Sequence, residues 1–488
     1  MLLTLLALST AHAWQCSTPG QLRADTANIV QMPIAQGTGD SLRDPFNVDG
    51  WLQTTEHFAL RWGPEATYTD SLMANIGDVL EEVWTHEVDT MGYPAPAGTD
   101  AFLLNVYVGS TGGGTPSVSG FATAFVSIDV EGFPYMVLSP ELVDAVRWDG
   151  EEAARGVLAH EFFHTIQASI GSLTEDPRSA WFWEASASWM VQEVAPEHPD
   201  VGAYVGAFAL SPHRSLEQMA AQPQTWLDLV QPYGAEIFVS YLEEFHGGPE
   251  IVRDLWLDAG PETIVASWLE TEFERTGVSW GETVLDFRVQ NTDYSAYAYA
   301  STYRESADSF ARSFPDDDRR STVFLPSEGT DGEERPQAAL LPEAYGANYI
   351  VLQTPLPGRM RVALQPDALG DLGTESQLHA AFVRVGDFDI DATPVSAEGV
   401  DVELTGEEDR VVLVVTAVPD TVTDGERFGY RFTMAYDELY TSSAQRDTTT
   451  DEPGCGCSAT PPPGLGWLAF GLGLPLLRRR STTGGSHP

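Results

Sequence analysis

Three residues near the middle of the chain, His160, Glu161 and His164, form the pattern H-E-x-x-H, and Glu184 follows after nineteen further residues. Two histidines four residues apart lie on one face of a helix, so both imidazoles can reach the same ion. A catalytic zinc ion takes three protein ligands and keeps a fourth position for water. Glu161 would point into the same cleft without binding the ion, where it can take a proton from water. The spacing therefore predicts a zinc site with His160, His164 and Glu184 as ligands and Glu161 as general base.

The elements that must carry these residues are predicted to be two buried helices. Residues 153–170 contain no proline, Asp149 can cap them, and apolar residues surround most of the helix. Residues 181–189 begin a second helix that is equally apolar, with Glu184 in its first turn. A buried, isolated glutamate is costly unless a partner neutralises it. This favours a ligand over the alternative, in which the two histidines are core residues and Glu184 is a helix-start acid.

The set His160, Glu161, His164 and Glu184 resembles the gluzincin metallopeptidases, in which H-E-x-x-H is followed by a glutamate about twenty residues later. The resemblance implies one catalytic zinc ion and hydrolysis of peptide bonds. It also implies a zincin domain, with a mixed sheet lobe and a helical lobe. Nothing in the sequence marks an exopeptidase anchor, so an endopeptidase acting on a peptide or protein substrate is expected.

Residues 232–235, which read Pro-Tyr-Gly-Ala, extend the resemblance to the segment after the zinc helices in aminopeptidase-type gluzincins. It implies that Tyr233 donates a hydrogen bond to the oxyanion of the tetrahedral intermediate. The alternative is that Tyr233 only packs on the core, with His213 or His246 as rival donors. Ser188 departs from the pattern, because several gluzincins have an aspartate there that orients a zinc histidine. Metal affinity or turnover could therefore be lower here.

Two other functions remain open. The first is a catalytically inactive zincin-fold surface protein whose β-sandwich binds a cell-surface or extracellular ligand. The intact Glu161 argues against it, because a structural zinc ion does not need a general base, whereas Ser188 and the lack of an obvious long propeptide argue for it. The second is a zinc hydrolase that acts on a substrate other than a peptide, since four residues do not define a substrate.

Composition restricts the partners. The formal net charge is −47, and all 25 basic residues are arginine. Such a chain repels nucleic acid and anionic membrane surfaces, so neither is expected to be a partner. The sequence leaves the oligomeric state open. The three cysteines, Cys16, Cys455 and Cys457, lie outside the body of the protein, which is therefore not stapled by disulfides.

Hydrophobic patterning predicts an α+β fold in two globular parts. Strand-like runs near 55–61 and 103–108 flank a long amphipathic helix near 68–91. Residues 135–138 are expected to be the edge strand to which zincins add a peptide substrate. The second part consists of short strands between turn residues, as in an all-β sandwich. Residues 387–391 alternate acids as a calcium loop could, but they lack the glycine and final glutamate of an EF-hand, so a solvated strand edge is favoured over Ca²⁺ binding.

Both ends of the chain carry targeting signals. An apolar run closing in Ala11-His12-Ala13 predicts a secretory signal peptide, with an N-terminal core strand as the alternative. Near the other end, Cys-Gly-Cys, an apolar stretch and three arginines resemble the C-terminal sorting tails of myxobacterial surface proteins. The resemblance implies a protein that is secreted or anchored at the bacterial cell surface, with a tail transiently in the membrane or recognised by sorting machinery. The alternative is a plain C-terminal membrane anchor.

The predicted order along the chain is a signal peptide (1–13), an N-terminal extension (14–50), a gluzincin-like catalytic domain (51–305), a linker (306–340), a β-sandwich domain (341–440), a polar linker (441–453) and a sorting or anchor tail (454–488).

Overall fold

The computed structural model divides the chain into two compact units, residues 1–440 and 441–488. Every residue that the structure describes lies in the first unit. The predicted signal peptide and C-terminal tail lie outside the described residues. No helix among the described residues is long and apolar enough to cross a membrane. The described residues are 15–16, 41–118, 122–217, 226–314, 322–325, 332–352, 357–366, 378–386, 389–423 and 425–437.

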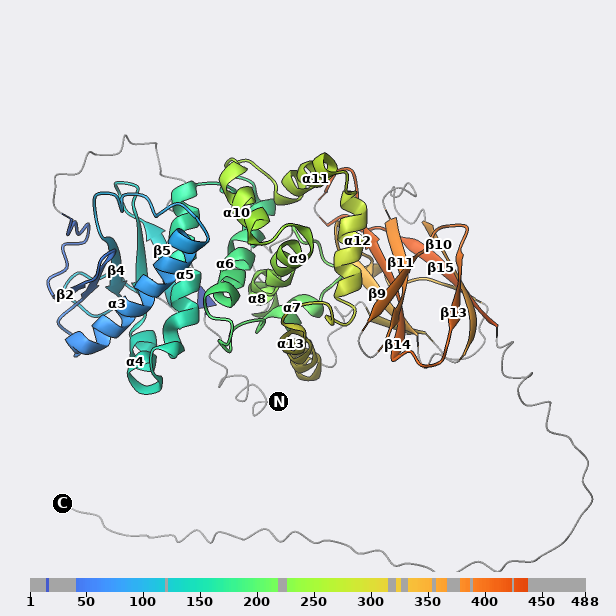
Figure 1. The fold of residues 1–488 in the computed structure, drawn as a ribbon, viewed down its shortest axis with the longest axis horizontal. Coiled ribbons are helices and arrows are strands. Elements are labelled where there is room, and N and C mark those ends of the chain that lie inside the picture. The colour runs from blue at the N-terminus through green and yellow to red at the C-terminus, as the bar shows by residue number, and fades with distance from the viewer. Residues whose placement is uncertain are drawn as a thin grey trace, which may run out of the picture. The chain divides into compact units, whose positions relative to one another are not determined.

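The predicted α+β class is confirmed: helices and separate sheets share the first unit (Figure 1). Its first sheet has the strand order β1-β5-β6-β4-β3-β2, in which β3, β4 and β6 run parallel and β5 runs antiparallel to β6. The strands are β1 (Gln15–Cys16), β2 (Trp51–Thr54), β3 (Phe58–Trp62), β4 (Leu104–Val108), β5 (Ala122–Ile128) and β6 (Pro134–Leu138).

The expectation that residues 135–138 form the edge strand is wrong. They belong to β6, which pairs with β5 on one side and β4 on the other. Four of the five β6 residues are buried, as expected for a strand covered on both faces. The strand beyond it is β5, whose far side pairs with the two-residue β1 at Ala122 and Ala124.

Helices α3 and α5 contact one another beside this sheet (Figure 1). Helix α3 (Asp70–Trp84) is capped by Thr69, whose hydroxyl accepts from the Leu72 amide, and it continues as a π-helix over Thr85–Thr90. Helix α4 (Pro140–Asp149) begins behind the cap Ser139, and α5 (Glu152–Ile170) ends at Gly171, whose left-handed backbone suits glycine. The predicted helices near 68–91 and over 153–170 are therefore confirmed.

Helices build the lobe that follows, as predicted. They are α6 (Ala180–Val194), α7 (Val205–Ala209), α8 (Trp226–Gly234), α9 (Glu236–His246), α10 (Pro249–Asp258), α11 (Val265–Thr276), α12 (Trp280–Gln290) and α13 (Ala300–Ser313). One hydrophobic core runs from the first sheet through α5 and α6 to α12.

Two further sheets enclose a second core. One has the order β13-β10-β15-β8 and the other β12-β11-β14-β9-β7, which is the sandwich expected from the short, spaced strands. The strands are β7 (Thr322–Leu325), β8 (Gly332–Glu334), β9 (Ala347–Leu352), β10 (Gly358–Pro366), β11 (Leu378–Val385), β12 (Ile390–Pro394), β13 (Val400–Leu404), β14 (Arg410–Ala417) and β15 (Tyr430–Asp437).

The five-stranded sheet is covered on both faces. Alternate side chains of β14 enter the sandwich core, while Val412 and Val414 pack outward with Val383 against Val289 of α12. This explains why β14 is buried at seven of its eight positions instead of alternating as β10 does. Part of the stretch predicted as a linker is regular structure, since α13 continues to Ser313 and both β7 and β8 lie within 306–340.

Candidate metal centre

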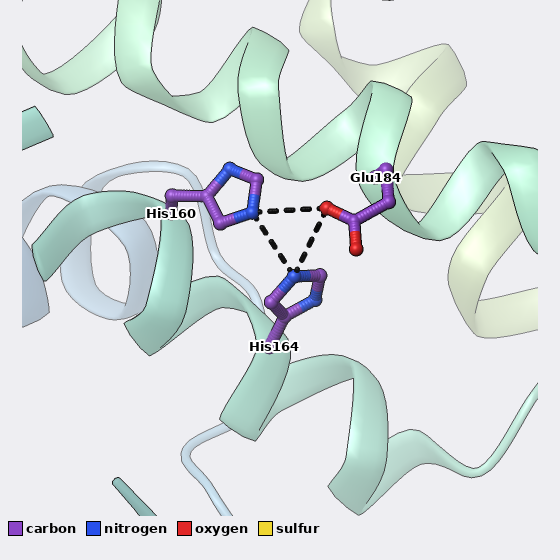
Figure 2. Close-up of side chains that lie close together, drawn as sticks. All are labelled: His160, His164 and Glu184. Atoms are coloured by element: carbon purple, nitrogen blue, oxygen red, sulfur yellow. Dashed lines mark hydrogen bonds and ion pairs between the residues drawn. The ribbon is translucent and has the colours of Figure 1, made fainter. Parts of the chain in front are cut away.

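Helices α5 and α6 bring three potential ligands together. His160 and His164 lie one turn apart on α5, and Glu184 reaches them from α6 (Figure 2). His160 Nε2 lies 3.1 Å from Glu184 Oε2 and 3.1 Å from His164 Nε2, and His164 Nε2 lies 3.6 Å from the same carboxylate oxygen. All three side chains are buried. Two imidazole nitrogens and a carboxylate oxygen thus converge on one point that could hold a metal ion.

These separations suit a shared ion. In a tetrahedral site with bonds of about 2.0–2.1 Å, neighbouring ligand atoms lie roughly 3.3 Å apart. The measured separations of 3.1, 3.1 and 3.6 Å bracket that value. Among the described residues, one group of three histidine, cysteine or acidic side chains has ligand atoms close enough together to share an ion, and it is this triad.

Gln167 fixes the orientation of His164. Its amide nitrogen donates to the carbonyl oxygen of Trp183 and to the hydroxyl of Ser186, both at 3.1 Å, so its oxygen must face the other way. That oxygen lies 2.5 Å from His164 Nδ1. Nδ1 therefore carries a proton and donates a hydrogen bond to Gln167, so Nε2 is the nitrogen that can bind a metal.

The electrostatics of the site favour a cation. Burial alone would raise the pKa of Glu184, but hydrogen bonds with His160 and His164 outweigh it and lower the pKa to about 2. Burial would lower the pKa of His164, yet the bond to the Glu184 carboxylate and that negative charge raise it instead. A carboxylate that stays ionised inside the protein needs positive charge beside it, and a divalent cation supplies that charge.

The comparisons with known proteins place the chain in a family. Residues 52–426, more than half of the sequence, match the family described as "Family of unknown function (DUF6055)". The chain belongs to this DUF6055 family. A comparison with curated proteins gave no match. The matched residues of this DUF6055 chain include the converging triad and reach into β14 of the sandwich.

Glu161 and Tyr233 of this DUF6055 protein line one small cavity together with His160. The cavity has a volume of about 40 Å³, enough for one or a few waters. The Tyr233 ring stacks on the His160 ring with 5.7 Å between centroids and 9° between planes. Glu161 is buried and comes from α5, whereas Tyr233 comes from α8. The structure therefore brings both predicted catalytic side chains to the cavity beside the triad.

The two rival oxyanion donors lie elsewhere. His213 is buried, and its carbonyl oxygen accepts from the amide of Glu343 at the start of the sandwich. His246 lies at the end of α9, where its Nε2 is 2.9 Å from the Tyr241 hydroxyl. Neither lines the cavity that holds His160 and Glu161.

Sequence reasoning missed three residues near this site: Gln167, Tyr204 and Asp200. The last two line the cavity, and Tyr204 lies against Tyr233 with 5.4 Å between ring centroids. They come from the turns between α6 and α7, whose sequence has no periodicity that could place them. A signal for Gln167 existed, because a residue three positions after His164 lies on the same helix face. Ser188, the position at which several gluzincins have an aspartate, also lines the cavity.

Proposed function

We propose that this DUF6055 protein is a secreted or cell-surface zinc-dependent endopeptidase. The observation that carries the proposal is the shared cavity of His160, Glu161 and Tyr233 beside the converged triad. A metal site alone could be structural, but a structural site is closed by four protein ligands. Here three ligands converge, and a carboxylate that is not one of them lies next to space for water.

Zinc is the metal that we expect, because two imidazoles and one carboxylate form the ligand set of a known class of catalytic zinc sites. His160, His164 and Glu184 would hold it. When bound, zinc supplies the positive charge that polarises a scissile carbonyl and makes water more acidic.

The residues of the chain itself supply the proton transfers and part of the charge stabilisation. Glu161 accepts the proton of the attacking water and passes it to the leaving amine. The Tyr233 hydroxyl donates a hydrogen bond to the oxyanion, which is worth a few kcal/mol in sites of this kind. Stacking on His160 holds the Tyr233 ring beside the metal ligands, so this donor is positioned before substrate arrives.

We assign the substrate backbone to the edge of β5. Thr123 of β5 lines the catalytic cavity. On the side of β5 away from β6, a segment of this chain, β1, pairs at Ala122 and Ala124. β1 occupies this edge in the structure, so an extended peptide substrate would make the same kind of pairing after displacing β1.

Cleavage of a mixed peptide library by the zinc-loaded full-length protein tests this function. Glu161→Gln removes the general base and keeps the side-chain shape, so we expect at least a hundredfold loss of cleavage with zinc still bound in a 1:1 ratio. Mass spectrometry of the products and metal analysis measure the two quantities. Glu152→Gln, an exposed glutamate on the same helix, is the matched control and should cut like the parent protein.

If neither the parent nor Glu161→Gln cuts although zinc is bound, the endopeptidase proposal fails. The inactive surface protein would then be the better description. Equal cleavage by both proteins would also sink the proposal, because it would show that Glu161 is not the base.

A further inference from the structure

A second and much larger cavity lies where α12 meets the outer face of the five-stranded sheet, and it has a volume of about 610 Å³. None of its lining residues belongs to the metal triad or to the small cavity beside it. The end of α12 and the turn after it contribute Arg288, Asn291 and Thr292, while β9 and β14 contribute Tyr349 and Val412. Figure 1 shows α12 beside these strands.

Arg288 is the unusual residue in this cavity. Its side chain is 1 % exposed, and its Nε and Nη2 both donate to the carbonyl oxygen of Tyr345, at 3.1 and 2.6 Å. The guanidinium carbon lies 5.1 Å from the ring centre of Phe208 and 5.0 Å from that of Phe287. Nη1 makes no hydrogen bond to any described residue. A buried guanidinium with an unused donor and no carboxylate bonded to it is costly, and here it stands in a chain whose net charge is −47.

Two residues close to Arg288 in the sequence also have a buried polar atom without a hydrogen bond. Asn291 Nδ2 and Thr292 Oγ1 are buried and make no hydrogen bond within the described chain. The other end of the Asn291 amide is engaged, because its oxygen accepts from the Tyr297 hydroxyl at 2.7 Å. Three unused hydrogen-bonding groups that can donate therefore come from five consecutive positions.

The carbonyl groups at this helix end do not compete for those donors. The Arg288 carbonyl accepts from the Tyr349 hydroxyl at 2.9 Å, and Arg410 donates to the Thr292 carbonyl. Tyr294, which also lines the cavity, has a φ of 63°, a left-handed conformation that costs free energy for a residue with a Cβ.

The remaining walls limit the kind of ligand. Valines of the sheet, including Val351 and Val385, line one side and favour an apolar body. Three aspartates also line the cavity: Asp293 pairs with Arg304 and Arg410, at 2.6 and 3.1 Å, and the other two are Asp308 and Asp409. Arg288 is thus the cation with no acid bonded to it, and the acidic chain disfavours a dianion such as phosphate.

We propose that this cavity binds a carboxylate attached to an apolar group. The carboxylate accepts hydrogen bonds from Arg288, Asn291 and Thr292, and the apolar group lies on the sheet valines. The carboxylate can belong to a free small acid or to the carboxyl terminus of a peptide, and both sources present the same chemistry to the donors. The proposal concerns binding alone and does not depend on the peptidase activity.

Isothermal titration calorimetry of the full-length protein tests it, with benzoate and benzamide as one pair of probes. Acetyl-Ala-Ala-Phe with a free or an amidated carboxyl terminus is the second pair. We expect each acid to bind at least about tenfold more tightly than its amide, because charge-assisted hydrogen bonds are the stronger ones. Binding of benzoate alone identifies a free acid as the ligand class, and tighter binding of the peptide acid identifies a peptide end.

Two variants tie binding to the cavity without removing Arg288, which also supports Tyr345. Asn291→Asp keeps the acceptor for Tyr297 but replaces the amide donor with a second carboxylate oxygen. Ala307→Trp fills the cavity from α13, and Glu305→Trp on the same helix, outside the cavity, is its matched control. We expect at least a tenfold loss of acid binding in the first two variants and none in the control.

Three outcomes overturn the proposal. They are the absence of binding by both acids, equal binding of acids and amides, and undiminished binding by Asn291→Asp and Ala307→Trp. In the first case Arg288 serves only to tie the sandwich to α12. A thermal melt of each variant shows whether it is folded, so a loss of binding is read only from folded protein.

Discussion

At the scale of single residues, the triad is supported by a side chain that binds no metal itself. Gln167 accepts from His164 Nδ1 and anchors its own amide nitrogen on Trp183 and Ser186. A bond of this kind holds the imidazole ring in the orientation that a metal needs and makes it a better ligand. In the proposed zinc site, Gln167 would thus orient the His164 ring.

Gln167→Met should therefore weaken zinc binding by about ten- to a hundredfold while the protein stays folded. Methionine keeps most of the volume but cannot accept from His164. Competition with a chelator measures the affinity. Gln192→Met is the matched control, because Gln192 is also buried and accepts from the Tyr303 hydroxyl at 2.9 Å without touching the triad. Equal zinc affinity of Gln167→Met and the parent would contradict the orienting role.

At the scale of elements, close approach between backbones positions Tyr233. Gly234 ends α8, and a Cβ placed there would lie 2.1 Å from the carbonyl oxygen of Tyr204, far inside van der Waals contact. The glycine lets α8 approach the turn before α7, so that Tyr204 and Tyr233 meet at the cavity.

Gly234→Ala should lower the free energy of unfolding by about 1–3 kcal/mol, because the added methyl group forces one backbone away from the other. Denaturant unfolding measures this change. Gly260→Ala is the control, since a Cβ there meets nothing closer than 3.7 Å. If the two variants have the same stability, close approach at Gly234 does not hold these elements together.

Local sequence patterns predicted single helices and strands much better than they predicted which elements pack against one another. The apolar residues around 153–170 and the spacing of the two histidines were enough to predict α5 and the convergence of both imidazoles on one face of it. The place of β6 within the sheet was missed, because strand order depends on pairing between distant segments. The large cavity was equally beyond reach, since the partners of Arg288 lie more than fifty residues away along the chain.

At the scale of the whole molecule, the excess of acids extends into the interior. Burial raises the pKa of Asp200, which lines the small cavity beside the triad, from 3.8 to about 7. The His198 ring lies 3.5 Å away but does not offset this effect, because burial lowers the pKa of His198 as well. The folded protein therefore binds a proton at Asp200 up to about pH 7, whereas the unfolded chain loses that proton near pH 4. Ionised Asp200 opposes folding above pH 7, and this cost disappears as the pH falls towards 4.

Asp200→Asn removes this cost, so it should stabilise the protein at pH 8 and change the stability little at pH 4.5. The full shift corresponds to an upper limit of about 4 kcal/mol at pH 8, and partial exposure of the side chain reduces it. Denaturant unfolding at the two pH values gives the difference between variant and parent. Asp258→Asn, at an exposed position on α10, is the control. A stabilisation that is the same at both pH values would contradict the buried charge.

The packing of α12 has a consequence for modularity. Val284 and Phe287 of α12 belong to the core of the helical lobe, while Val289 of the same helix packs on the valines of the sandwich. One helix thus belongs to two hydrophobic cores, and a cut between residues 306 and 340 would separate it from the strands that Val289 contacts. The sandwich is consequently not a separable module that could be transferred to another protein without this helix. The family match, residues 52–426, includes α12 and residues of both cores in one stretch.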